Sequence, residues 1–148
     1  LLKTLIEAIP KIAGEFHFPA NTKINYFEQD LQWENPYQTP LQYLSEHFPK
    51  ETVKELRKHL AKAGLPNQLA QEPLSTLSGG EQTKVKLCQM TMQKGNLLIL
   101  DEPTNHIDQA TKDSLRESLA NFAGTVIVVS HEESFYQDWT DRVIEISQ

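Results

Sequence analysis

Two adjacent acidic residues, Asp101 and Glu102, follow the four apolar residues Leu97 to Leu100 and stand directly before Pro103. The apolar run is too short for a membrane span and lacks helical periodicity, so it predicts a strand that is buried on both faces of a parallel sheet. Ligands of open α/β sheets bind at the carboxyl ends of the strands. Two carboxylates at such an end indicate a metal ligand beside a general base.

Taken alone, an acidic pair after an apolar run marks a surface turn more often than a site. Two further predicted strands, however, also end beside polar side chains: Gln29 follows Lys23 to Phe27, and His131 follows Thr125 to Ser130. The carboxyl ends of parallel strands share one edge of a sheet. We therefore expect an amide, two acids and an imidazole to converge at that edge.

A second candidate site is the turn Leu77 to Gln82, Leu-Ser-Gly-Gly-Glu-Gln, which opens a predicted helix. Ser78 and Glu81 have the spacing of a capping box, which is a sufficient structural explanation for both. A cap does not need glycines, whereas Gly79 and Gly80 allow the backbone to approach a ligand closely. Amide groups at the positive end of a helix dipole suit a phosphate, so the turn indicates a phosphate contact as well as a helix start.

The segments that must position these residues change in character along the chain. The first part predicts a helix over 1–9, strands over 15–18 and 23–27, and helices over 39–48, 51–63 and from Ser78 to Gly95. The last third predicts a strand over 97–100, a helix over 108–121, a strand over 125–130, a short helix from Glu132 and a strand over 142–146. This alternation indicates parallel strands joined by right-handed crossovers.

The composition bounds the class of protein. At 148 residues the chain can form one domain with a real core, and its mean hydropathy of -0.49 is that of a soluble protein. The net charge of -6 argues against a domain that coats nucleic acid through bulk electrostatics. The single cysteine, Cys88, excludes an internal disulfide and fits a reducing cytosol.

Together these motifs resemble those of ATP-binding cassette (ABC) ATPases, in the order in which that family has them. Leu77 to Gln82 resembles the signature motif, and Leu97 to Glu102 resembles the Walker B strand. Gln29 matches the Q-loop glutamine, and His131 matches the switch histidine. Thr104 to Asp108, Thr-Asn-His-Ile-Asp, is similar to the D-loop of the ABC-F branch, whereas transporter cassettes usually differ at the Asn-His pair.

The resemblance implies a role for each matching residue at the strand ends. Asp101 would hold Mg²⁺, and Gln29 would contact both the metal and the attacking water. Glu102 would polarise that water, and His131 would contact the γ-phosphate of ATP. These roles agree with phosphoryl transfer, which needs positioning and charge neutralisation more than covalent help.

For the turn at Leu77 to Gln82, which we call the signature turn, the resemblance implies contact with a second ATP-binding cassette. Ser78, Gly79 and Gly80, in the nucleotide-binding turn that includes Glu81, would bind the γ-phosphate of ATP held by the opposing cassette. Asp108 would lie at the interface between the two cassettes. It is equally well explained as the N-cap of its own helix.

The fold that the resemblance implies is an α/β P-loop NTPase of the RecA-like kind, in which a parallel-sheet core carries an inserted α-helical subdomain. Residues 1–37 and 96–148 would form a partial core, and residues 38–95 would form the helical subdomain with the signature motif. No Gly-x-x-x-x-Gly-Lys-Ser/Thr phosphate loop (Walker A) is present, and the first residue is not methionine. We therefore expect a fragment that is incomplete at its N-terminus and that neither holds nor hydrolyses ATP by itself.

Four classes of function fit these observations. The leading one is a piece of a cytoplasmic ABC-F protein whose parent hydrolyses ATP and acts on the ribosome and its RNA, in translation or in antibiotic resistance. The alternative is the nucleotide-binding subunit of an ABC transporter, which would need a membrane partner because this chain contains no membrane domain. A third is a metal-dependent hydrolase, although the regular ligand spacing of a zinc site is absent. Its candidate residues would be Asp101, Glu102, His106, Asp108 and His131. A non-catalytic interaction module, the fourth, leaves the acids unexplained.

Overall fold

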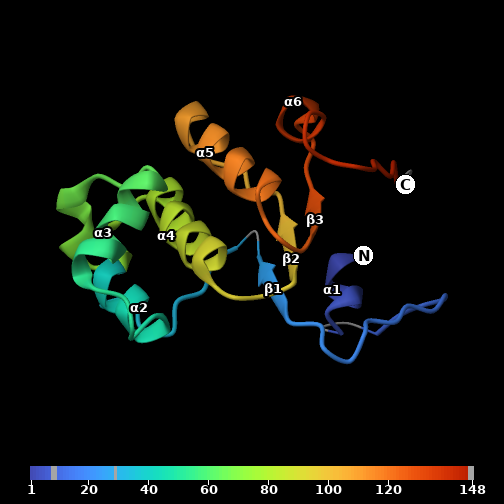
Figure 1. The fold of residues 1–148 in the computed structure, drawn as a ribbon, viewed down its shortest axis with the longest axis horizontal. Coiled ribbons are helices and arrows are strands. Elements are labelled where there is room, and N and C mark those ends of the chain that lie inside the picture. Colours follow the sequence, from blue (N-terminus) through green and yellow to red (C-terminus); the bar gives the residue numbers. More distant parts are fainter. Residues whose placement is uncertain (8–9, 29, 147–148) are drawn as a thin grey trace.

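Three parallel strands form the centre of the structure, a computed structural model that describes residues 1–7, 10–28 and 30–146. β2 (Leu97–Asp101) lies between β1 (Ile24–Phe27) and β3 (Thr125–Val129). Both pairings are parallel, so the carboxyl ends of the three strands lie at one edge of the sheet (Figure 1). The apolar residues of β2 are buried on both faces, as the sequence predicted.

Side-chain caps fix the start of most helices. Thr39 and Ser78 each form a capping box, and Thr52 and Asp108 each accept a hydrogen bond from a backbone N–H three residues on. The helices are α1 (Leu2–Leu5), α2 (Pro40–His47), α3 (Val53–Lys62), α4 (Gly79–Met92), α5 (Gln109–Ala120) and α6 (Glu133–Tyr136), with the short 3-10 helices η1 (Asn67–Gln71) and η2 (Leu74–Thr76). None of the described helices is long and apolar enough to cross a membrane.

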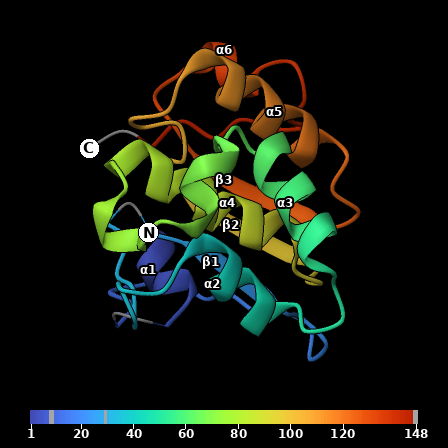
Figure 2. The ribbon, with the colours of Figure 1, turned by 90° about the vertical axis from the view of Figure 1, so that its left-hand side faces the viewer.

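Apolar side chains gather in three places. Because successive side chains of a strand point to opposite faces, Leu98 and Leu100 pack under α4, α5 and α6, whereas Leu97 and Ile99 pack on the side of α1. A third group, which we call the helical cluster, fills the space among α2, α3, η1, η2 and α4 around Leu56. Figure 2 shows α2, α3 and α4 in front of the sheet, and α4 supplies residues to both the helical cluster and the sheet core.

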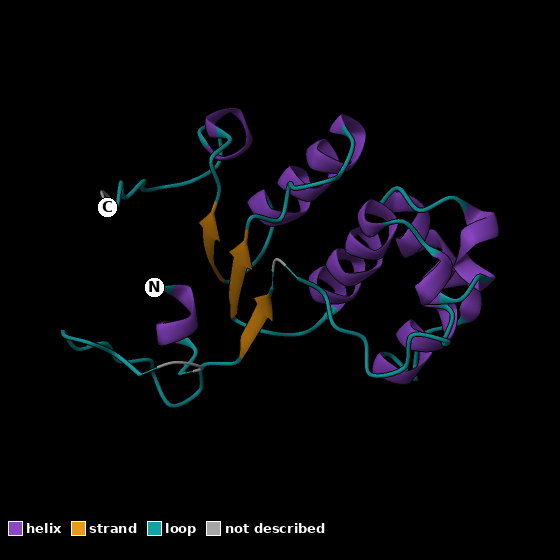
Figure 3. Cartoon of the chain, turned by 180° about the vertical axis from the view of Figure 1, so that it is seen from behind, coloured by secondary structure: helices purple, strands orange, loops and turns teal. Residues whose placement is uncertain are grey.

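Two predicted strands are wrong. Glu15 to Phe18 and Arg142 to Ile146 run without regular structure, and neither pairs with a described strand (Figure 3). Alternating apolar residues predicted strands at both places. A strand also needs a neighbour that satisfies its backbone hydrogen bonds, and no described strand provides one.

The predicted helices are present, but two of them end early. α1 ends at Leu5, and residues 8 and 9 of the predicted first helix lie outside the described part of the chain. α4 ends at Met92 rather than Gly95, because Gln93 already has an extended backbone. The two 3-10 helices were not predicted.

Candidate functional site

The carboxyl end of β2 brings together Asp101, Glu102 and His131, which we call the acidic edge. Asp101 ends the strand, and the backbone N–H of Glu102 donates to the carbonyl of Val129 in β3 at 2.9 Å. Glu102 itself has a left-handed backbone with φ +47°, a conformation that costs a non-glycine residue about 1–3 kcal/mol. Nε2 of His131 lies 3.0 Å from Oε1 of Glu102. The two acids and the imidazole thus meet at one edge, as expected from the sequence.

The two partners at the acidic edge differ in exposure. The side chain of Glu102 is only 11% exposed, whereas that of His131 is 94% exposed. Oε1 of Glu102 is buried and accepts no hydrogen bond from the described residues, although Nε2 of His131 lies nearby. A buried acceptor without a donor costs about 1–3 kcal/mol. This oxygen is therefore suited to orient a water molecule.

An open hollow of about 380 Å³ borders the acidic edge, and Asn105 and Glu132 also line it. Within the described residues, no three His, Cys, Asp or Glu side chains are placed to hold a metal ion together. Asp101 fits Mg²⁺, because Mg²⁺ takes one or two protein carboxylates and completes its coordination with water and phosphate oxygens.

Glu132, the residue after His131, is bonded to two neighbouring elements. It accepts a hydrogen bond at 2.9 Å from the hydroxyl of Thr104, a buried residue in the loop that follows Glu102. Nζ of Lys112 in α5 donates to both of its oxygens, at 2.9 and 2.7 Å. The bond from Lys112 and then the bond from Thr104 lower the pKa of Glu132. Glu132 is therefore a carboxylate at neutral pH.

Asp108, at the end of the same loop, is both an N-cap and an ion-pair partner. Its Oδ1 accepts from the backbone N–H and the hydroxyl of Thr111 at 2.8 and 2.9 Å. Its Oδ2 lies 2.7 Å from Nζ of Lys84 in α4. The hydrogen bond from Lys84, followed by those from Thr111, holds the pKa of Asp108 well below its usual range. The N-cap is confirmed, whereas a place at an interface between cassettes stays a prediction.

The turn at residues 77–82 is a capped helix start, as predicted. Oγ of Ser78 accepts from the N–H of Glu81 at 3.2 Å, and the Glu81 carboxylate accepts from the N–H of Ser78 at 2.8 Å. The two glycines differ, because a Cβ on Gly79 would meet no atom within 4 Å, whereas one on Gly80 would collide with the carbonyl oxygen of His106. Gly80 therefore allows α4 to pack against a loop of its own chain, and only Gly79 faces open space.

Gln29, the predicted Q-loop residue, lies outside the described residues, but the segment after it reaches the turn at residues 77–82. Nε1 of Trp33 donates to Oε1 of Gln82 at 2.8 Å. Nε2 of Gln82 in turn donates to the carbonyl of Leu77 at 3.1 Å. Gln82 thus connects the segment that follows Gln29 with the turn that carries the two glycines.

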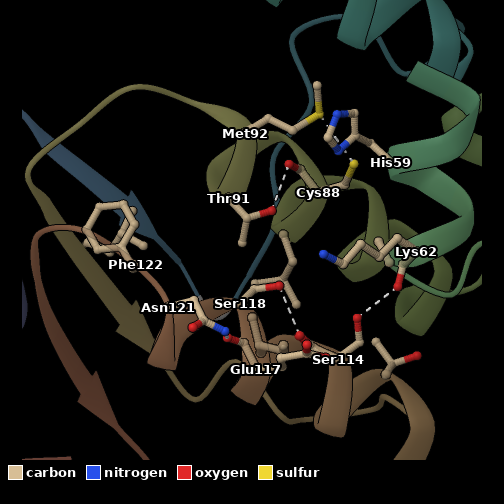
Figure 4. A pocket seen from close by; sticks show the side chains of 15 residues that line it. His59, Lys62, Cys88, Thr91, Met92, Ser114, Glu117, Ser118, Asn121 and Phe122 are labelled. Atoms are coloured by element: carbon tan, nitrogen blue, oxygen red, sulfur yellow. Dashed lines mark hydrogen bonds between the residues drawn. The ribbon is translucent and has the colours of Figure 1, made fainter. Parts of the chain in front are cut away.

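A second cavity, of about 280 Å³, lies away from the acidic edge between α3, α4 and α5 (Figure 4). Two of the hydroxyl groups that line this cavity donate to backbone carbonyls: Ser114 bonds to the carbonyl of Lys62 at 2.8 Å, and Thr91 bonds to that of Cys88 at 3.1 Å. Burial raises the pKa of the Cys88 thiol to about 12, so this residue is an inert packing group.

The sequence analysis missed the residues that hold the site in place. Lys84 and Lys112 stand 24 and 20 positions from their carboxylate partners, and pairs so far apart leave no local pattern. Glu132 offers one signal, which is its position directly after His131. The Tyr26 hydroxyl is buried without a hydrogen-bond partner among the described residues, and burial and then nearby negative charge raise the pKa of Tyr26.

The chain is similar in sequence to a known protein family and to several of its members. The family model described as ABC transporter matches residues 1–105. Human ATP-binding cassette sub-family F member 3 is 40% identical to this chain over 136 residues, which cover 91% of this chain and 19% of the human protein. The chain spans between 19% and 30% of the length of the curated relatives it matches.

Two solved structures share the fold. The archaeal ribosome recycling factor aABCE1, in complex with the archaeal ribosomal stalk protein aP1, has a TM-score of 0.79 at 19% identity and covers 95% of this chain and 28% of that one. The dimeric ATP-binding cassette MJ0796, in a post-hydrolysis state with ADP and Pi, has a TM-score of 0.62 at 23% identity and covers 78% of this chain and 55% of that one. At these identities the likeness establishes the fold alone, a parallel sheet covered by helices.

Proposed function

This chain belongs to the ABC transporter family, and we propose that it is one ATP-binding cassette of a protein that hydrolyses ATP. The observation that supports this proposal is the acidic edge, where a buried oxygen of Glu102 has no hydrogen-bond donor among the described residues and lies 3.0 Å from Nε2 of His131. In this proposal Asp101 would hold Mg²⁺, which would neutralise charge on the phosphates. Glu102 would orient the attacking water, His131 would contact the γ-phosphate, and Gln29 would contact the metal and the water.

The signature turn serves a second cassette in this proposal. Ser78 and Gly79 are exposed at the start of α4 and do not line the hollow at the acidic edge. Their amide groups suit a phosphate that approaches from outside the chain, because the positive end of the α4 dipole points there. The dimeric state of MJ0796 supports a partner cassette for this surface.

The test replaces Glu102 in the polypeptide that contains this chain together with a Gly-x-x-x-x-Gly-Lys-Ser/Thr loop. Glu102→Gln should lower kcat by about 10²–10⁴-fold, as expected for loss of a general base, while ATP binding persists. Glu133→Gln is the matched control, because Glu133 is an exposed acid close to the same site. Unchanged turnover in Glu102→Gln would contradict the proposal.

The isolated chain should behave differently. A phosphate at a helix N-terminus gains about 1–2 kcal/mol, whereas even a millimolar affinity needs about 4 kcal/mol. We therefore expect titration calorimetry on the 148 residues to detect no micromolar binding of MgATP. Such binding would mean that the described residues supply more of the nucleotide site than the acidic edge and the signature turn.

We further propose that the whole protein acts on the ribosome in the cytoplasm, as an ABC-F factor in translation or antibiotic resistance. The similarity of Thr104 to Asp108 to the ABC-F loop supports this, as do the human sub-family F relative and the fold neighbour in complex with a ribosomal stalk protein. The second candidate, a transporter subunit, is supported by the family description and by MJ0796, a bacterial ABC transporter cassette. Sedimentation of the Glu102→Gln protein with ribosomes supports the first, and recovery with membranes supports the second.

A further inference from the structure

The residue after His131 is held by more polar contacts than His131 itself. Within the described chain, the His131 side chain has one polar contact, the 3.0 Å approach to Glu102. Glu132 has three side-chain contacts, two from Lys112 and one from Thr104, and its backbone N–H donates to Oγ of Ser130 at 3.1 Å. The position of the exposed imidazole is therefore set by its chain neighbours.

The contacts of Glu132 lead to both sides of the acidic edge. Thr104 belongs to the loop that follows Glu102, and Lys112 belongs to α5, which begins where that loop ends. On the other side of His131, the carbonyl of Val129 accepts from the N–H of Glu102. The segment that carries His131 is thus bonded to the segment that carries Glu102 both before and after the imidazole.

We propose that Glu132 is a positioning residue for the reaction at the acidic edge. Through Thr104 and Lys112 it holds His131 within reach of Glu102, so the inference rests on the proposed ATP hydrolysis. The carboxylate side chain is 37% exposed and the Lys112 side chain 21% exposed, so the pair is only partly screened by solvent. A displacement of about 1 Å at a reacting group is enough to lower a rate about 10²-fold.

The experiment uses the whole polypeptide described for Glu102→Gln. Glu132→Gln keeps the size of the side chain and removes its charge, and we expect kcat to fall by about 10–100-fold with KM for ATP unchanged. Glu133→Gln is the matched control and should leave both constants unchanged. Exchanging the two charges, Glu132→Lys with Lys112→Glu, should restore most of kcat.

The outcomes separate this inference from the proposed function. If Glu102→Gln is inactive while Glu132→Gln and Glu133→Gln hydrolyse ATP at equal rates, the positioning role is overturned and the ATPase assignment stands. If Glu102→Gln is fully active, both are overturned.

If Glu132→Gln does not fold, Thr104→Val is the fallback variant, because it removes only one hydrogen bond to Glu132. A kcat equal to that of the unmodified protein would then overturn the positioning role. A rise in KM for ATP with unchanged kcat in Glu132→Gln would also overturn the positioning role.

Discussion

Leu44, Leu56 and Leu74 in the helical cluster are completely buried, whereas Glu102 and His131 at the acidic edge keep a buried oxygen without a donor and an almost fully exposed ring. The α-helices around the cluster start at side-chain caps, which are local features of the sequence. The acidic edge depends on bonds between residues far apart in the chain. Burial stabilises the first region, and long-range polar contacts hold the second in a conformation that it would not adopt alone.

The largest effect should follow from opening the helical cluster. Leu56→Ala removes a fully buried side chain and leaves a cavity, so we expect the free energy of unfolding to fall by about 2–5 kcal/mol. Val53→Ala in the same helix is the control, because Val53 is 55% exposed. Urea denaturation followed by circular dichroism measures both, and equal losses would contradict the contrast between buried and exposed positions.

Substitutions at Gly79 and Gly80, two neighbours in one turn, should change the stability in opposite directions. Gly80→Ala places a Cβ against the carbonyl oxygen of His106, and overpacking of this kind costs about 1–3 kcal/mol. Gly79→Ala meets no atom and replaces glycine in a helix, which stabilises by up to about 1 kcal/mol. Opposite shifts in the urea midpoint are therefore expected. Shifts of the same sign would mean that α4 does not pack on this loop.

The ion pair at Asp108 should have a smaller effect that depends on pH. Asn is also a good N-cap, so Asp108→Asn removes mainly the pair with Lys84. Because the carboxylate is 55% exposed, we expect a loss below about 1 kcal/mol at pH 7. Its folded-state pKa lies below the ordinary 3.8, so the contribution is present above that pH and is lost as the pH falls through the lowered pKa.

Urea denaturation at pH 7 and at pH 2 checks this effect. The stability difference between the unmodified chain and Asp108→Asn should shrink at the lower pH. The same substitution made in a Lys84→Met background should show little difference at either pH. A difference that grows on acidification would have the wrong sign for a carboxylate stabilised in the folded state.

The smallest effect is expected in the segment 142–146. Val143 is 55% exposed and belongs to no described strand, so Val143→Ala should change the free energy of unfolding by less than about 0.5 kcal/mol. A loss above about 1 kcal/mol would show that this segment is packed in solution, as the sequence pattern predicted for a strand.

Local features of the fold could be predicted from the sequence, whereas long-range contacts could not. The buried strand at Leu97 to Leu100 and the capped helices were predictable because periodicity and caps are local. The ABC-F resemblance, drawn from short motifs, is confirmed by the family match and the sub-family F relatives. The predictions of strands at 15–18 and 142–146 were wrong, because an alternating pattern does not show whether a neighbouring strand is available for pairing. The division into residues 1–37 with 96–148 and residues 38–95 stays a prediction.

Side-chain partners could not be predicted in the same way. The sequence placed Glu102 and His131 at one edge because strand ends share an edge. The bonds of Glu132 to Lys112 and Thr104 depend on how α5 lies over the sheet, which no local pattern records. The contact behind Gly80 likewise depends on the path of the loop at His106.

The left-handed backbone of Glu102 has a consequence for evolution in the laboratory. Glycine and asparagine adopt this conformation more readily than glutamate, so either residue at position 102 should make the chain more resistant to heat while removing the acid. A selection for thermal tolerance alone would therefore favour loss of this carboxylate.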